Sequence, residues 1–520
     1  MKKYAYILVI ISTFFTSSCK EFLAEEPQSI ISEDQYYNTE SDAATAINAV
    51  YFFLNTARVQ SPYNTLFNTG MNMAGDDEDP GPGATNPDVR SLAVLAHSTS
   101  NLRVYELWQQ HYAAIRKANV VLAKIPAISF AVPATKNRIL GEAKFLRALF
   151  YFNLVRLYGD VPLVTDYQNY VYASDYAVAR TSSADVYTQI EKDLTEAAQV
   201  LPASYNAPDA GRATAGAAKA LLAKVYLIKA SLPLKLAENY QKAIAKAEEA
   251  LSTADGGTGT YGYDLKADYA QVFLPAYKNG AEHIFSAQMK GNSYSQGNSE
   301  NPRAIYTSIP GLTGNYAHMV RFYTEGNDKS FSIYKLYKAA DKRRDVTFVR
   351  SFTSPTNGRK YGLPIANTAV ANDSTPFWHK WWDPANTSVT SNSEANIPII
   401  RYAELLLIHA EAENEVNGPT AKAYKSINRV RKRAGLADLT LGLSQARFRD
   451  SLYLERRLEL SYEYQRWFDL IREKDASGNG ILISSLQKVG KTNVAAKHYL
   501  YPIPQTEIDN NPKLTQNAGW

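Results

Sequence analysis

The chain has 520 residues, of which 45% are hydrophobic and 21% charged, a balance typical of a folded globular protein. This composition excludes a wholly disordered chain and a membrane protein with many spans. A net charge of +5 is small for this length and gives no electrostatic reason to expect nucleic-acid binding. The unusual feature is the aromatic content of 36 Tyr, 19 Phe and 6 Trp, because tyrosine is favoured both on recognition surfaces and in cores.

The first residues predict an export signal rather than a part of the fold. Two lysines precede an apolar segment over 4–15, which is too short to span a membrane as a mature helix. Ser17 and Ser18 then place small residues before Cys19, the one cysteine of the chain. The pattern predicts a lipoprotein signal peptide over 1–18, with Cys19 carrying lipid as the first mature residue. The alternative is a plain secretory signal with an incidental cysteine.

Apolar residues recur at helical spacing over about 33–254 and again over about 400–475. In the first part, Ser182 resembles a helix N-cap and Pro202 a stop, which predicts one helix between them. The other helices predicted from the spacing cover 42–54, 104–125, 135–158, 214–230, 236–251, 401–416, 420–434 and 444–473.

Two stretches, 220–251 and 402–435, share an arrangement of a helix with small residues, a polar turn and a second helix. Small residues such as Ala220 and Ala403 let two helices approach closely, as they do in tetratricopeptide-like helix pairs. The periods are irregular, so we expect a repeat-like scaffold rather than a regular solenoid. The predicted fold class is mainly α.

The helical pattern is lost between about 255 and 400, where Gly, Asn, Ser, Thr and Pro are interleaved with aromatics. Long loops of this kind are often functional, so we predict a ligand-binding region there. Its aromatic candidates are Tyr294, Tyr306, Trp378, Trp381 and Trp382, and the Trp378–Trp382 cluster is expected either to be exposed for stacking or to be packed. The tail over 476–520 is predicted to be extended and to dock on the body.

No catalytic motif stands out. The histidines form no H-E-x-x-H pattern and there is no G-x-S-x-G elbow. The G-x-G-x-x-G match over 257–262 follows a helix instead of a strand and is predicted to be a turn. Asp76 and Asp77 open an acidic segment that we interpret as a solvated or ligand-facing loop, since the spacing of a calcium loop is absent. Trp108 and Tyr112 share one face of a predicted helix and are assigned to the core.

Several segments, in order along the mature chain, resemble the SusD/RagB family of bacterial nutrient-uptake lipoproteins. The segments that carry the resemblance are Cys19-Lys20-Glu21-Phe22-Leu23, Gly141-Glu142-Ala143-Lys144-Phe145-Leu146-Arg147-Ala148, Tyr158-Gly159-Asp160-Val161-Pro162-Leu163, Gly211-Arg212-Ala213-Thr214, Ile400-Arg401-Tyr402-Ala403-Glu404-Leu405, Glu455-Arg456-Arg457-Leu458-Glu459-Leu460, Arg466-Trp467-Phe468-Asp469-Leu470 and Pro502-Ile503-Pro504.

The resemblance implies one domain over 19–520, in which about eight tetratricopeptide-like helices support loops that capture glycans or, in some members, peptides. It also implies a lipid anchor on the outer face of the outer membrane and a SusC-like TonB-dependent transporter as partner. Neither catalysis nor a cofactor is implied. In glycan-binding members, some polar ligand contacts come from the region between the first two long helices. In this chain that region contains Asp76, Asp77, Arg90 and Asn101.

Three alternatives remain at this stage beside a glycan receptor. The same scaffold could bind peptides, which the weak net charge and abundant tyrosine do not exclude. A surface hydrolase could use paired carboxylates such as Asp76 and Asp77. A purely structural adaptor could use its helix pairs only to hold the transporter.

Overall fold

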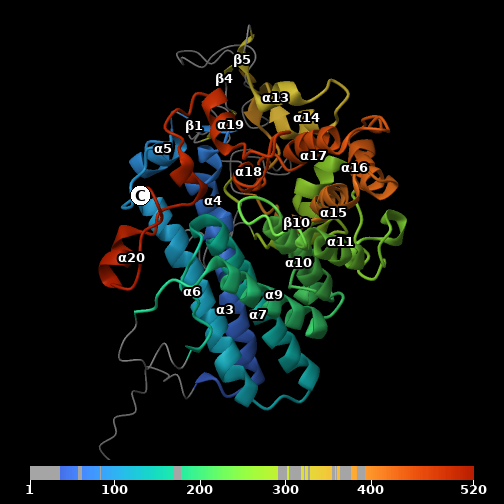
Figure 1. Cartoon of the computed structure of the whole chain (residues 1–520). Helices are drawn as coiled ribbons and strands as arrows, with labels where there is room; N and C mark the ends of the chain where they lie inside the picture. Colours follow the sequence, from blue (N-terminus) through green and yellow to red (C-terminus); the bar gives the residue numbers. More distant parts are fainter. Residues whose placement is uncertain are drawn as a thin grey trace, which may run out of the picture.

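The computed structural model describes residues 36–56, 61–81, 83–167, 177–290, 301–303, 318–320, 323–325, 328–353, 358, 360–362, 376–382 and 393–520. Cys19 and the export signal lie outside these residues, as do two of the candidate aromatics, Tyr294 and Tyr306. In Figure 1, the long helices from the first part of the chain lie side by side in the lower half of the molecule, and shorter helices and short strands share the upper half.

The N-terminal scaffold consists of four long helices that pack in sequence order. α6 contacts both α3 and α7, and α7 contacts α9. Ser182 caps the last of them as predicted, because its side chain accepts a hydrogen bond from the amide of Asp185. The helices are α3 (Glu40–Asn55), α6 (Leu102–Lys124), α7 (Pro133–Tyr158) and α9 (Ser183–Val200), with the short α4 (Phe67–Gly70) and α5 (Pro87–Ala93) before α6.

The scaffold continues with helices that pack as neighbouring pairs. α10 packs on α11, α11 on α15, and α15 on α16, and this arrangement confirms the mainly helical, tetratricopeptide-like prediction. Small residues are buried at these contacts, among them Ala220, Ala223, Ala403 and Ala410. The helices are α10 (Ala215–Ala230), α11 (Asn239–Ala250), α15 (Tyr402–Asn417), α16 (Ala421–Arg433) and α17 (Gln445–Glu459).

One predicted helix is wrong in extent. The expected helix over 444–473 is interrupted: α17 ends at Glu459 and a separate helix, α18, covers Arg466–Leu470. Tyr462 and Tyr464 between them have φ values of 58° and 63°, a left-handed conformation that no α-helix contains. Both side chains are buried, so tertiary packing of the two rings outweighs the local helical preference.

The middle of the chain is irregular, as predicted, but it also contains short antiparallel strand pairs. The pair of β10 with β2 joins this region to the start of α15. The predicted turn over 257–262 follows α11 after a short 3-10 helix over Thr253–Asp255, and Gly259 and Gly262 there have positive φ. The strand pairs are β1 (Glu78–Pro80) with β3 (His318–Val320), β2 (His283–Ala287) with β10 (Ile397–Arg401), β4 (Tyr323–Glu325) with β5 (Asp328–Phe331), β6 (Phe348–Val349) with β9 (Phe377–Trp378), and β7 (Ser351–Thr353) with β8 (Lys360–Gly362); two short helices, α13 (Ile333–Leu336) and α14 (Arg343–Thr347), accompany them.

The C-terminal tail is less extended than expected. It contains α19 (Leu482–Lys488) and α20 (Gln505–Asn510), and α20 lies beside α6 at the flank of the scaffold (Figure 1). The tail does pack on the body: the Tyr501 hydroxyl donates to the Gly70 carbonyl at 2.6 Å. Burial of the Tyr501 and Ile503 side chains reinforces this attachment.

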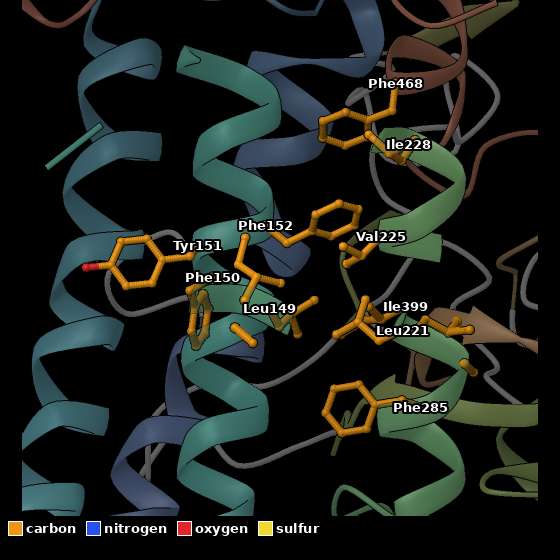
Figure 2. Close-up of a cluster of buried hydrophobic side chains, with 14 of the residues drawn as sticks. Leu149, Phe150, Tyr151, Phe152, Leu221, Val225, Ile228, Phe285, Ile399 and Phe468 are labelled. Atoms are coloured by element: carbon orange, nitrogen blue, oxygen red, sulfur yellow. The ribbon is translucent and has the colours of Figure 1, made fainter. Parts of the chain in front are cut away.

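The core is centred on α7, whose C-terminal half is buried on every side. In Figure 2, Leu149 and Phe152 of α7 extend toward Leu221 and Val225 of α10, whereas Tyr151 extends away from α10. Gly141 allows the close approach of α9, because a Cβ atom there would lie 2.6 Å from the Val200 side chain. The same helix therefore contacts its neighbours on all faces and fixes the positions of the scaffold helices around it.

Candidate ligand-binding site

Asp76 and Asp77 do not form a solvated or ligand-facing loop, so that expectation is wrong. Both side chains are buried, and Arg466 donates two hydrogen bonds to Asp76 at 2.7 Å each. Arg457 pairs with both carboxylates, at 3.1 Å from Asp76. Burial alone would raise the pKa of Asp76, but the charges of Arg457 and Arg466 outweigh it and hold the pKa below its usual value. These carboxylates join the loop before β1 to α17 and α18.

The two other polar candidates have different environments. Asn101 is buried and caps α6, since its side-chain oxygen accepts from the amides of Arg103 and Val104. Its amide nitrogen donates to the Asp88 carbonyl at 3.0 Å, which leaves a structural role in capping as its observed function. Arg90 is exposed near the end of α5 and donates to the Gly81 carbonyl at 3.1 Å.

The three tryptophans expected as a possible exposed platform are buried, so exposure was the wrong alternative. Trp378 is 1% exposed and stacks on Tyr462 with ring centroids 5.0 Å apart. Trp381 is also 1% exposed, and its indole N–H donates to the Tyr462 carbonyl at 3.2 Å. Trp382 is 4% exposed and contacts the ring of His379. Trp378 and Trp381 belong to a second hydrophobic cluster under the irregular region, as packing elements.

A groove of about 310 Å³ runs along the outer face of α6, and we call it the α6 groove. One wall is α6 itself, another is the segment after α7, and the third is the C-terminal tail around α20. The residues that line it are Trp108, Gln109, Tyr112, Ala113, Ile115, Arg116, Asn119, Pro162, Val164, Tyr167, Val178, Glu507, Asn511 and Leu514. Three rings and several hydrogen-bonding groups thus line one concave surface.

Hydrogen bonds hold the walls of the α6 groove in place. The Tyr112 hydroxyl donates to the Pro162 carbonyl at 2.8 Å, and the Asn119 amide donates to the Val164 carbonyl at 2.7 Å. On the opposite side, the Asn511 amide donates to the Val178 carbonyl at 2.9 Å. Because these bonds tie both α6 and the tail to backbone carbonyls of the segment after α7, the shape of the groove is set before any ligand enters.

Charged groups in the α6 groove remain available for a ligand. Arg116 is exposed and forms no ion pair or hydrogen bond with any residue that the structure describes. Glu507 is partly buried at the facing wall. Burial raises the pKa of Glu507, and its hydrogen bond with Trp108 opposes this shift. The groove therefore presents a donor on one wall and an acceptor on the other, with aromatic surface between them.

The sequence assignment of Trp108 and Tyr112 to the core was half right. Trp108 is 3% exposed, whereas Tyr112 is only partly buried and borders the α6 groove. Tyr112 and Arg116 are four residues apart on one helix face, a spacing that could have indicated a shared surface. The partner wall at Glu507 comes from nearly the far end of the chain, and no local pattern indicates it.

Among the residues that the structure describes, no group of three or more His, Cys, Asp or Glu side chains is arranged to hold a metal ion. None of the described helices has the length and apolar character needed to cross a membrane.

Comparison with known proteins decides the family. A family model described as SusD family matches residues 243–520, more than half of the chain. The chain belongs to the SusD family. A second model, described as starch-binding associating with outer membrane, matches residues 21–227, so SusD-type sequence covers both halves of the scaffold. The resemblance seen in the sequence motifs is confirmed.

Individual SusD relatives match over nearly their whole length. SusD-like protein P25 of Formosa agariphila is 27% identical, with 98% of this chain and 97% of the relative covered. The starch-binding protein SusD of Bacteroides thetaiotaomicron is 24% identical, with 88% and 86% covered. A solved structure called a laminarin-binding SusD-like protein superposes with a TM-score of 0.73 at 25% identity, covering 93% of this chain and all of that one.

Proposed function

We propose that this protein is a non-enzymatic cell-surface receptor that captures an oligo- or polysaccharide and delivers it to a SusC-like TonB-dependent transporter. The observation that carries the proposal is the full-length match to SusD-family proteins, two of which are named for the glucans they bind, starch and laminarin. The assignment of a glycan ligand to this chain rests on those relatives. Finding a peptide ligand on the same scaffold would contradict the glycan assignment.

The chemistry of the α6 groove suits a sugar. A pyranose ring has apolar C–H faces that can lie against the ring of Tyr112, and its hydroxyls can bond to charged groups. Arg116 can donate to a hydroxyl oxygen, while Glu507 can accept from a hydroxyl hydrogen. We therefore propose the groove as a glycan contact surface. Arg90 on the exposed side of α5 remains a second candidate contact.

The function is tested by a binding screen on the soluble chain lacking residues 1–19. Purified protein is applied to arrays of plant, algal and microbial glycans and, in parallel, to a peptide library. We expect binding to one class of glycan, and we expect the bound glycan to be recovered chemically unchanged. Binding to peptides alone would contradict the glycan proposal. Recovery of a shortened glycan would contradict the proposal that the protein is not an enzyme.

Replacing Arg116 by alanine should weaken binding of the glycan found in that screen by about 10- to 100-fold, because hydrogen bonds to charged groups contribute about 1.5–3 kcal/mol. Isothermal titration calorimetry measures the change. Lys117→Ala is the matched control, since Lys117 is the next residue of α6, is also exposed and does not line the groove. Equal affinities of the two variants would place the glycan site elsewhere while leaving the receptor function intact.

We also propose that Cys19 carries the lipid that anchors the protein to the outer membrane, facing the cell exterior. The Cys19→Ala variant should fold normally but leave the membrane fraction. Several acyl chains hold a protein firmly at a membrane, and the variant would carry no acyl chain. Cell fractionation and fatty-acid labelling measure this. A Ser18→Thr variant, which keeps the thiol, controls for a general effect of altering the signal. If Cys19→Ala protein still labels with fatty acid in the membrane, the anchor is elsewhere.

A further inference from the structure

Arg156 of α7 is an unusual buried cation. Its guanidinium lies between the rings of Phe152 and Phe468, 3.9 and 3.6 Å from their centroids. Nε donates to the Phe152 carbonyl at 3.1 Å and Nη2 donates to Asn153 at 2.6 Å. Nη1 is buried and has no hydrogen-bond partner among the residues that the structure describes. Both N–H donors of Nη1 are thus left unsatisfied on a buried charge, which is costly in a folded protein.

Several other buried arginines are neutralised by carboxylates. Arg343 lies 2.6 Å from Glu455, and Arg472 lies within 2.9 Å of Glu411 and Asp469. Arg156 has no carboxylate at ion-pair distance in the described chain; Glu404 and Asp469 influence it only from further away. Burial lowers the pKa of Arg156 to about 10, as expected for a guanidinium that is not fully compensated.

Arg156 also lines a cavity of about 250 Å³ whose walls are mainly apolar. The cavity lies between α7, the start of α9, the end of α10 and the tail before Tyr501, and Phe468 and Ile228 of its lining lie close together in Figure 2. An apolar cavity of about 150 Å³ is enough to take up benzene. This space is larger, and its partly exposed rim at Leu232 and Leu234 provides an entrance.

A second hydrogen-bond donor lies in the same wall. Tyr187 of α9 is 3% exposed and its ring contacts that of Phe152 at 6.4 Å. Its hydroxyl forms no hydrogen bond with the described residues. The remaining charged side chain of the lining, Arg472, is already neutralised by Glu411 and Asp469. An anion entering the cavity would therefore find Arg156 as the charged donor and the Tyr187 hydroxyl as a further donor. Ser183 and Tyr499 also carry hydroxyls in the lining, and that of Ser183 already donates to Asp160.

We propose that this cavity binds a small amphipathic carboxylate, with the carboxylate paired to Arg156 and the apolar body among Val155, Ile228 and Leu500. The occupant satisfies Nη1 with a charge-assisted hydrogen bond, which is about twice as strong as a neutral one. The competing arrangement is a single water beside Arg156, because a second space of about 10 Å³ next to Asn153 and Lys224 also borders this residue.

The test uses octanoate as the probe and octanamide as its uncharged match, titrated into the soluble chain by calorimetry at neutral pH. We expect octanoate to bind at least about 10-fold more tightly than octanamide. Arg156→Met keeps an apolar side chain between the two phenyl rings, and it should reduce octanoate affinity about 10- to 100-fold and remove the preference for the anion. Thermal unfolding of each variant checks that it is folded.

A pair of variants at the rim tests the location without touching Arg156. Leu234→Trp should block the entrance and abolish octanoate binding, whereas Leu236→Trp, at an exposed position two residues on and outside the lining, should leave it unchanged. If the folded wild-type chain does not bind octanoate, water is the hydrogen-bond partner of Arg156 and the proposal is wrong. Equal binding of both probes, or full affinity in Arg156→Met, would also overturn it. Glycan binding is measured separately, so either result leaves the receptor function untouched.

Discussion

Replacing Glu459 by glutamine is expected to remove at least about 3–5 kcal/mol of folding stability, because the change leaves buried positive charges without their shared partner. Glu459 is fully buried at the end of α17, 2.5 Å from Arg401 and 2.9 Å from Arg343. It also pairs with Arg433. A domain has about 5–15 kcal/mol of net stability, so this loss is a large fraction of the total. Urea unfolding followed by circular dichroism measures it.

The control for that substitution is Asp438→Asn. Asp438 pairs with Lys432 at 3.2 Å, but both side chains are about half exposed or more, so water screens the pair and its loss should cost less than about 1 kcal/mol. Similar unfolding midpoints for the two variants would contradict a central role for Glu459.

The contribution of Glu459 to folding stability should also depend on pH. Burial would raise its pKa, but Arg433, Arg401 and Arg343 hold the folded-state pKa well below the ordinary value of 4.5. The stabilisation is therefore complete above pH 4.5 and is lost as the pH falls from there toward the folded-state pKa. The stability difference between wild type and Glu459→Gln should shrink over that acid range and stay constant near neutrality.

Truncating Trp378 to alanine is expected to cost about 3–5 kcal/mol of stability while the folded fraction keeps its glycan affinity. The indole is buried, and its ring centroid lies 4.8 Å from that of Phe348 and 5.0 Å from that of Tyr462. Removing it therefore leaves a cavity. Thermal unfolding and calorimetric titration with the glycan measure the two quantities separately. Trp381→Ala should behave in the same way, since Arg303 lies 4.2 Å above its ring.

Tyr277→Ala serves as the matched aromatic control, because Tyr277 is 37% exposed and its loss should change stability by about 0.5 kcal/mol or less. If Trp378→Ala instead kept its melting temperature and lost glycan affinity, the ring would have to be reachable by ligand and the packed arrangement would be wrong.

Local signals account for most of the scaffold that the sequence predicted. Ser182 and Thr214 combine an N-cap side chain with a following apolar pattern, so the starts of α9 and α10 could be placed to within a residue. The break after Glu459 could not, because the left-handed conformations of Tyr462 and Tyr464 depend on rings and an arginine that lie far away in the sequence.

The candidate site was harder to predict for the same reason. An acidic run such as Asp76-Asp77 is compatible with a solvated loop unless the arginines of α17 and α18 are known to face it. The three tryptophans lie in a segment without periodicity, so nothing local distinguishes an exposed ring from a buried one. Only the α6 wall of the groove could be predicted from the sequence, because Glu507 comes near α6 only in the folded structure.

The ion pairs of Asp76 and Asp77 have a consequence for the order in which the chain folds. Their partners Arg457 and Arg466 are 380 to 390 residues away, so they are synthesised long after the first helices. Until they arrive, burying two neighbouring carboxylates is unfavourable, so the loop that carries them is expected to stay in water. Contacts of such long range form slowly because the entropy of closing the intervening loop must be overcome first. The pairing thus delays burial of this loop until Arg457 and Arg466 are present, and a chain truncated before them would keep its acidic loop in water.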